Sequence, residues 1–144
     1  MTSVCLIGAG NVGQQFYHAF KKSQTTKVTQ WYNRTISTIL SFQNEVAITD
    51  DIAKLIKADL YIVAVSDDQL SEISKSLPFS ERFVVHTCGA VNIHDLDKKN
   101  RRGVFYPLQT FSKSKIMDFK HVPLCIEALE KEDYLMLKSI AESL

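Results

Sequence analysis

Val4-Cys5-Leu6-Ile7-Gly8-Ala9-Gly10-Asn11-Val12-Gly13 is the stretch of sequence that decides the fold. Its first four residues are apolar, as in a buried strand, and the remaining six have the spacing G-x-G-x-x-G. Residues 14–22 follow with apolar side chains at helical spacing. Strand, glycine-rich turn and helix in this order form the context in which G-x-G-x-x-G binds the pyrophosphate of a dinucleotide. The sequence therefore predicts that all of the segment from Gly8 to Gly13 contacts a dinucleotide cofactor.

Each glycine of the motif has an expected physical role. Gly8 allows a sharp turn out of the strand, Gly10 lets the backbone approach a pyrophosphate, and Gly13 lets the helix pack closely on the strand. The amino end of the following helix offers N–H groups and the positive end of its dipole to phosphates. The alternative is a glycine turn in an α/β fold that binds no ligand.

Beyond the motif, segments with strand-like and helix-like patterns alternate along the chain. Residues 60–65 form a continuous apolar run, which is typical of a central parallel strand covered on both faces. The alternation predicts an α/β fold: a doubly wound, mostly parallel Rossmann sheet with helices on both faces. The expected further strands are 27–32, 46–49, 82–85, 104–106 and 122–127, and the expected further helices are 35–43, 52–57, 69–77, 91–98 (a short helix or turn) and 130–144.

The second predicted strand ends in Asn33-Arg34-Thr35, about 20 residues after the last glycine of the motif, where this fold contacts the adenosine ribose. An NAD site usually has an acidic residue there, which would repel a 2′-phosphate. Arg34 can instead pair with that phosphate, and Thr35 can donate its hydroxyl. The segment therefore favours NADP over NAD. Alternatively, Arg34 only ends the strand and Thr35 caps the next helix.

Residues at the carboxyl ends of parallel strands face the ligand crevice of such a fold. Val65 and Ser66 follow the apolar run and are expected to contact the cofactor. The neighbouring Asp67 and Asp68 resemble paired carboxylates, but N-capping of the next helix is the preferred interpretation.

Composition limits the classes of function. The chain has 144 residues, so one domain covering residues 1–144 is expected, and its formal net charge of +1 gives no electrostatic case for binding nucleic acid or an anionic membrane. No signal peptide is visible in the sequence, and no apolar run is long enough to cross a bilayer. Together with three scattered cysteines, this pattern leads us to expect a cytoplasmic protein with reduced thiols. The histidines are also scattered, so no metal site is expected.

The chain resembles the NADP-binding domains of the 6-phosphogluconate-dehydrogenase-like superfamily, which includes pyrroline-5-carboxylate reductases. The resemblance rests on the glycine motif, on Asn33-Arg34-Thr35 and on the run that ends at Val65. The segments 86–89 (His-Thr-Cys-Gly) and 103–112 are more similar to a bacterial family of NADP oxidoreductases, in which a Rossmann-like domain precedes an all-helical domain of unknown function. One departure is Cys88, where that family usually has serine.

The resemblance implies that a helical domain follows the Rossmann-like domain. The last predicted helix of this chain has no stop signal, so we expect that the helical domain is missing here. In related reductases this domain completes the active site and forms the homodimer. The substrate pocket would then be built largely from residues outside these 144.

Side chains for proton transfer are less clear. His86 ends the fifth strand and titrates in a useful range, so it is a weak catalytic candidate, as are Gln109 and Thr110 in the loop that the resemblance places near the nicotinamide. Tyr106 is expected to pack in the core. Cys88 could act as a nucleophile, but the sequence shows no general base at a spacing that would identify it as the partner of this thiol. The favoured function is hydride transfer between NADP and a small carbonyl or imine substrate. The alternative is a non-catalytic dinucleotide-binding or redox-sensing module.

Overall fold

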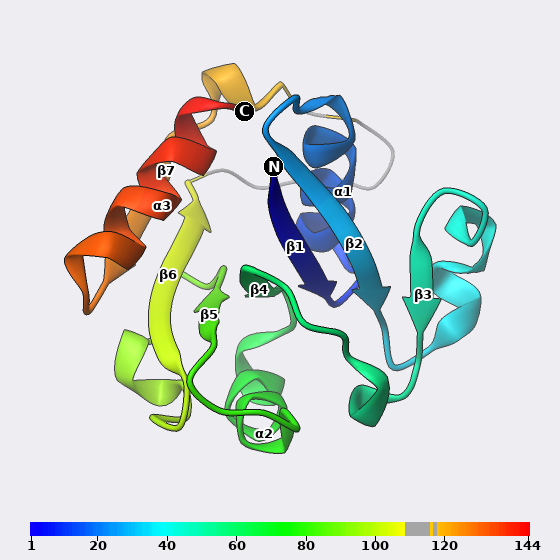
Figure 1. The fold of residues 1–144 in the computed structure, drawn as a ribbon, viewed down its shortest axis with the longest axis horizontal. Helices are drawn as coiled ribbons and strands as arrows, with labels where there is room; N and C mark the ends of the chain where they lie inside the picture. The colour runs from blue at the N-terminus through cyan, green and yellow to red at the C-terminus, as the bar shows by residue number, and fades with distance from the viewer. Residues whose placement is uncertain (109–115, 117) are drawn as a thin grey trace.

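A computed structural model describes residues 1–108, 116 and 118–144 of the chain. Strands and helices alternate through most of it, as expected from the sequence (Figure 1). The elements are β1 (Thr2–Ile7), α1 (Asn11–Lys22), β2 (Thr26–Tyr32), β3 (Ala47–Thr49), β4 (Leu60–Val63), α2 (Asp67–Ser76), β5 (Phe83–His86), β6 (Arg101–Pro107), β7 (Leu124–Ala128) and α3 (Lys131–Glu142).

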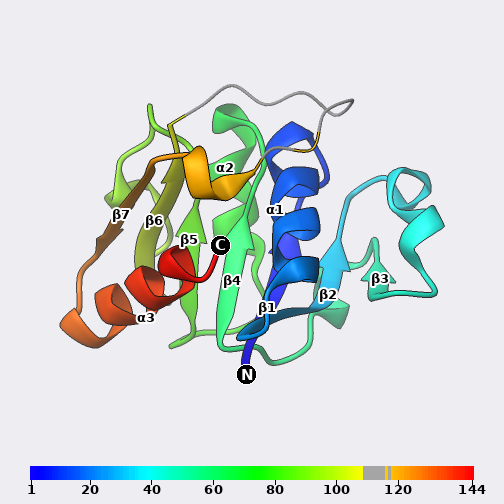
Figure 2. The same cartoon turned by 90° about the horizontal axis from the view of Figure 1, so that it is seen from above.

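The strands form a seven-stranded sheet in the order β3-β2-β1-β4-β5-β6-β7, with β3 and β7 at its edges (Figure 2). From β1 the chain first builds outward through β2 to β3 and then returns to place β4 on the other side of β1. This reversal makes the gap between β1 and β4 the topological switch point, where open α/β sheets bind ligands. The predicted doubly wound α/β fold is confirmed.

Of the strands in the described residues, only β7 runs antiparallel, pairing with β6 from Leu124 to Ala128. A parallel neighbour would need a crossover connection, usually a helix, to return the chain to the starting edge. The described part of the connection between β6 and β7 holds a single short 3-10 helix, Phe119–His121.

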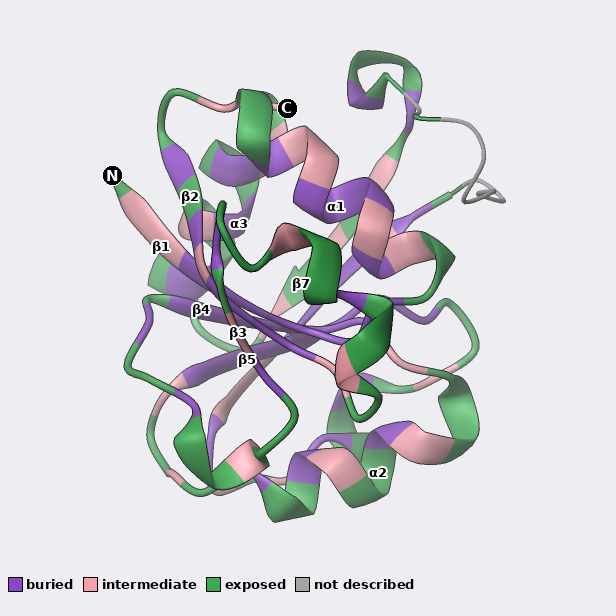
Figure 3. Cartoon of the chain, turned by 90° about the vertical axis from the view of Figure 1, so that its right-hand side faces the viewer, coloured by how far each residue is buried: buried purple, intermediate pink, exposed green. Residues whose placement is uncertain are grey.

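The sheet lies between two layers of helices, with α1 and α3 on one face and α2 on the other (Figure 3). Alternation along β1 shows how the sequence builds both cores. Val4 and Leu6 pack with α1, whereas Cys5 and Ile7 pack with the α2 layer, and all four are fully buried. A strand covered on both faces must be apolar throughout, which is why the first residues of the chain form a continuous hydrophobic run.

Three predicted helices are shorter in the structure. Residues 35–43 form two 3-10 helices, Ile36–Thr38 and Leu40–Phe42, and of the apolar side chains in this segment only Ile39 is buried. The Ser, Thr and Ile residues there are poor helix formers. Residues 52–57 and 91–98 likewise contain only the 3-10 helices Ile52–Lys54 and Ile93–Asp95.

The start of α2 also differs from the expectation. The N-cap is Ser66, and Asp67 and Asp68 occupy the first helical turn, so the prediction that these aspartates cap the helix was wrong. Their position still has a physical reason, because carboxylates in the first turn interact favourably with the helix dipole.

Candidate functional site: a crevice along the carboxyl ends of β1, β4, β5 and β6

Two glycines of the motif have no room for a side chain. Gly8 has a φ of +106°, and a Cβ atom there would lie 2.2 Å from the carbonyl oxygen of Ala64. A Cβ atom on Gly13 would lie 2.4 Å from the carbonyl oxygen of Gly8. Gly10 differs, because apart from its chain neighbours no atom of the described residues comes within 4 Å of its Cβ position. The turn therefore packs tightly against β4 and α1 but is open at Gly10, where a ligand can approach the backbone.

Side chains outside the motif hold the turn in shape. The indole N–H of Trp31 donates a hydrogen bond of 2.8 Å to the carbonyl oxygen of Gly8, whose own N–H donates to Tyr32. The side-chain amide of Gln14 donates to the carbonyl oxygen of Ala9 at 2.9 Å. These bonds preorganise the loop before any ligand binds. Neither Trp31 nor Gln14 was predicted to contact the loop, because nothing in the local sequence pattern shows that their side chains reach it.

The amino end of α1 begins at this turn and suits an anion. Its N-cap is Gly10, no side chain caps it, and no acidic residue lies in its first turn. Lys21 and Lys22 lie in its last turn, at the negative end of the dipole. No acidic residue of α1 itself neutralises the positive end of the dipole, which is presented to the crevice. Asp67, from the first turn of α2, also lines the crevice.

At the end of β2, Asn33-Arg34-Thr35 border a cavity of about 230 Å³ that Gly8 and Val65 also line. The Asn33 backbone N–H donates to Thr49, and its side-chain amide donates to the carbonyl oxygen of Thr35 at 2.9 Å, so Asn33 shapes the turn. Arg34 is exposed and makes no hydrogen bond or ion pair with any residue that the structure describes. Its charge is available to a ligand.

A larger cavity of about 640 Å³ continues from the glycine turn along the ends of the neighbouring strands. Its lining brings together residues far apart in sequence: Gly8, Ala9, Gly10, Asn11, Val12, Asn33, Val65, Ser66, Thr87, Cys88, Gly89 and Tyr106 are among them. The predicted contacts at the end of β4, Val65 and Ser66, thus lie beside the glycine turn. Ser66 is exposed, and its hydroxyl does not cap α2.

Cys88 lies in this lining as a neutral thiol. Its sulfur is 3.5 Å from the carbonyl oxygen of Val65, to which it donates. Burial and the neighbouring Asp67 carboxylate raise the pKa of the thiol to about 12. A cysteine acts as a nucleophile only as the thiolate, so this environment makes Cys88 unreactive near neutral pH.

His86 is fully buried and is not among the residues that line the crevice. Its Nδ1 accepts a hydrogen bond of 3.1 Å from the backbone N–H of Cys88, and its Nε2 has no partner of hydrogen-bond geometry among the described residues. Burial lowers the pKa of His86, opposed by the nearby Asn92 backbone and the Asp95 carboxylate. The imidazole is therefore held neutral behind the crevice wall, and its catalytic role stays a prediction.

Two further predicted residues, Gln109 and Thr110, lie outside the described part of the chain. Tyr106 was expected in the core, yet it is only partly buried and lines the crevice. One sequence signal could have identified it: the residue at the carboxyl end of a parallel strand, next to the core residue Phe105, faces the ligand side.

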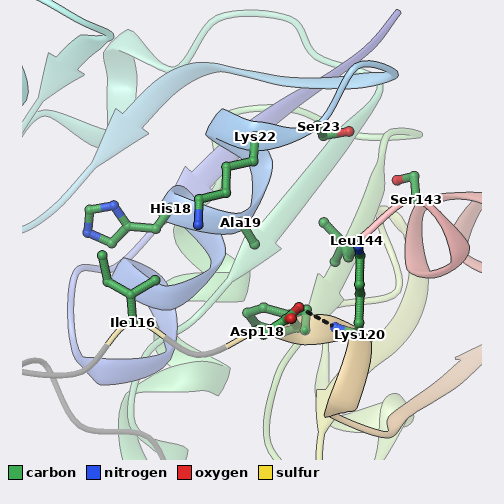
Figure 4. Close-up of a pocket in the computed structure, with 10 residues that line it drawn as sticks. His18, Ala19, Lys22, Ser23, Ile116, Asp118, Lys120, Ser143 and Leu144 are labelled. Carbon is green, nitrogen blue, oxygen red and sulfur yellow. Dashed lines mark hydrogen bonds between the residues drawn. The ribbon is translucent and has the colours of Figure 1, made fainter.

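A separate cavity, of about 410 Å³, lies at the other end of α1 (Figure 4). His18 and Lys22 line it from α1, opposite Asp118 and Lys120. The Asp118 carboxylate accepts the backbone N–H of Lys120 and so caps its own 3-10 helix. This cavity is at the negative end of the α1 dipole and away from the strand ends, so it lacks the features that suit the crevice to phosphates.

Within residues 1–108, 116 and 118–144, no group of His, Cys, Asp and Glu residues could hold a metal ion. No helix among these residues is long and apolar enough to cross a membrane.

Comparison with protein families matches residues 3–88 to the family described as NADP oxidoreductase coenzyme F420-dependent. A search of curated proteins finds no match. Among solved structures, the chain is 35% identical to a Bacteroides fragilis protein described as a "putative NADP oxidoreductase", with a TM-score of 0.84, covering 99% of this chain and 57% of that one. The chain thus spans little more than half the length of that relative.

Two more distant structures share the fold. The imine reductase from a Pseudomonas species is 15% identical, with a TM-score of 0.74, and the match covers 99% of this chain and 52% of that one. The pyrroline carboxylate reductase of Plasmodium falciparum, solved with NADP bound, is 14% identical, with a TM-score of 0.75 and coverage of 99% and 55%.

Proposed function

The chain belongs to the family described as NADP oxidoreductase coenzyme F420-dependent, and on that basis we propose that it is the NADP-binding domain of an oxidoreductase. The reaction we propose is hydride transfer to a small carbonyl or imine substrate. The observation that carries the proposal is the continuous lining from Arg34 past Gly10 to Ser66, which follows the carboxyl ends of the strands on both sides of the switch point.

The residues present fit the dinucleotide. The open face at Gly10 and the uncapped amino end of α1 would hold the pyrophosphate. Asn33, Arg34 and Thr35 would border the adenosine ribose, and Val65 and Ser66 would lie beside the nicotinamide half. When bound, the nicotinamide supplies the hydride, while the protein supplies position and electrostatics.

The preference for NADP rests on Arg34. Its guanidinium is exposed beside the cavity and is not neutralised by a described carboxylate. A guanidinium can bind a phosphate through two parallel charge-assisted hydrogen bonds, and the ribose hydroxyl of NAD offers no such charge. Structures that share the fold include one solved with NADP bound and others solved with NAD bound, so the preference is argued from Arg34 and not from the fold.

The substrate class is suggested by the printed names of structures that share the fold, the imine reductase and the pyrroline carboxylate reductase. Because the chain spans 57% of the Bacteroides fragilis relative, we propose that a helical domain completes the substrate pocket and forms a homodimer. We propose a cytoplasmic location, in which the buried thiols of Cys5 and Cys88 would stay reduced.

Calorimetric titration with NADPH and NADH tests the cofactor assignment. We expect the chain to bind NADPH more tightly, and Arg34→Glu to weaken NADPH binding by roughly 10-fold to 100-fold, the size expected for hydrogen bonds between charged groups. NADH should then bind the variant at least as tightly as NADPH.

Arg102→Glu is the matched control, because it makes the same charge change at the amino end of β6, away from the crevice. NADPH affinity that survives Arg34→Glu would show that Arg34 does not bind the 2′-phosphate. No binding of either dinucleotide would overturn the proposed function. Binding without turnover of oxo acids or cyclic imines by the protein with its helical domain would favour the non-catalytic module.

A further inference from the structure

Tyr106 lies where β6 extends past the end of its neighbour. His86, the last residue of β5, pairs with Val104, so Tyr106 lies two residues beyond the part of β6 that pairs with β5, although it still pairs with Cys125 of β7. Phe105 packs in the core with α1. Because successive side chains of a strand point to opposite faces, Tyr106 points away from that core. Its side chain therefore reaches the segment that follows β5.

The Tyr106 ring contacts Gly89 in that segment. A Cβ atom on Gly89 would lie 2.4 Å from Cζ, 2.5 Å from Cε2 and 2.7 Å from the hydroxyl oxygen of Tyr106. The hydroxyl edge of the ring thus occupies the space that any larger residue at position 89 would need. Tyr106 is only partly buried, and no described residue forms a hydrogen bond with its hydroxyl.

The order of the residues along the crevice indicates which part of a bound dinucleotide would lie beside Tyr106. Arg34 marks the adenosine end and Gly10 the pyrophosphate, which is the middle of a dinucleotide. A dinucleotide binds across the switch point. The nicotinamide half must then extend from Gly10 toward Ser66 and Gly89, where Tyr106 forms part of the wall.

We propose that Tyr106 and Gly89 form the subsite for the nicotinamide, with the Tyr106 hydroxyl as a hydrogen-bond donor to the carboxamide oxygen. A phenol can donate one hydrogen bond from a rigid ring, which suits a positioning role. Cys88, the neighbouring candidate, already donates its thiol hydrogen to Val65. The inference rests on the proposed function, because it assumes that NADP occupies the crevice.

The test compares NADPH with 2′-phospho-ADP-ribose, which keeps the adenosine, the 2′-phosphate and the pyrophosphate but lacks the nicotinamide. We expect Tyr106→Phe to weaken NADPH binding about fivefold to tenfold, as for the loss of one hydrogen bond, and to leave binding of the shorter ligand unchanged. Gly89→Ala, which displaces the ring, should weaken NADPH binding by at least the same factor and spare the shorter ligand. Calorimetry measures both affinities.

Tyr134→Phe is the matched control, since Tyr134 lies on α3 with 40% of its surface exposed and does not line the crevice. It should change neither affinity. If Tyr106→Phe weakens both ligands equally, or leaves NADPH binding at the wild-type value, the nicotinamide subsite is wrong while the proposed function stands. If the unmodified chain binds neither ligand, the proposed function fails, and the subsite fails with it.

Discussion

The two ends of the crevice are built in different ways. At the pyrophosphate end, one short segment supplies the turn, and its shape is dictated by backbone contacts that exclude a Cβ atom at Gly8 and Gly13. At the proposed nicotinamide end, the wall combines residues at or after the carboxyl ends of three different strands, such as Ser66, Cys88 and Tyr106. At this end, side-chain atoms and not backbone atoms make most of the surface that a ligand would contact.

This difference indicates how each end responds to change. A backbone cradle tolerates almost no substitution, because an added Cβ atom collides with main-chain atoms that cannot move without distorting the sheet. A wall of side chains can be altered one residue at a time without loss of the fold. Binding of the phosphates and recognition of the substrate side should therefore be separable by mutation.

The glycines provide the largest expected effect. Gly8→Ala and Gly13→Ala should each lower the free energy of unfolding by at least about 3 kcal/mol, because each methyl group would overlap a backbone carbonyl. Gly10→Ala should leave stability within about 0.5 kcal/mol of the wild type yet weaken NADPH binding, since its Cβ would enter open space. Urea unfolding and calorimetry measure the two quantities. Equal loss of stability in all three variants would contradict the backbone account.

The titration of His86 should have an intermediate effect on the free energy of unfolding, and this effect depends on pH. Burial lowers its pKa below the ordinary value of about 6.5, so on acidification the unfolded chain binds a proton before the folded chain does. Stability should be complete above pH 6.5 and fall as the pH decreases from there toward the folded-state pKa, by up to about 1.4 kcal/mol per pH unit.

His86→Asn should reduce this slope, because its side-chain oxygen can still accept the Cys88 N–H but does not titrate. The comparison uses the difference between the two proteins, since burial also lowers the pKa of His18 and adds to both slopes. Urea unfolding between pH 5 and pH 8 is the measurement. If the free energy of unfolding changes with pH in the same way in the wild type and in His86→Asn, His86 is not the titrating group.

Substitution of Cys88 should have the smallest effect on stability. Cys88→Ser should change the free energy of unfolding by less than about 1 kcal/mol, because the hydroxyl can replace the thiol as donor to Val65.

In the unmodified chain, alkylation at pH 8 should label the exposed Cys125 and spare Cys5 and Cys88, since burial raises the pKa of both thiols to about 12. Mass spectrometry locates the label, and rapid modification of Cys88 would contradict its assignment as a neutral thiol.

The sequence predicted the fold class and the place of the glycine turn because strand and helix patterns are local and strong. It was less reliable for the short helices after β2 and β3, where 3-10 helices replace the expected α-helices. It also misplaced Tyr106, because a tyrosine in an apolar strand has the same local pattern on either face, and only its place at the carboxyl end of the strand indicated the crevice. The antiparallel direction of β7 had no local signal.

The sequence by itself determined the strand, turn and helix around Gly8 to Gly13, since these depend on the conformations that each residue allows and on contacts between near neighbours. Only the tertiary structure decided that the carbonyl of Ala64 closes over Gly8, that Trp31 holds the turn from β2, and that Tyr106 lies on Gly89. These contacts join segments that are 17 to 56 residues apart, and they depend on strand order and register. No local propensity encodes such distances, so the proposed nicotinamide end became visible only once the sheet was assembled.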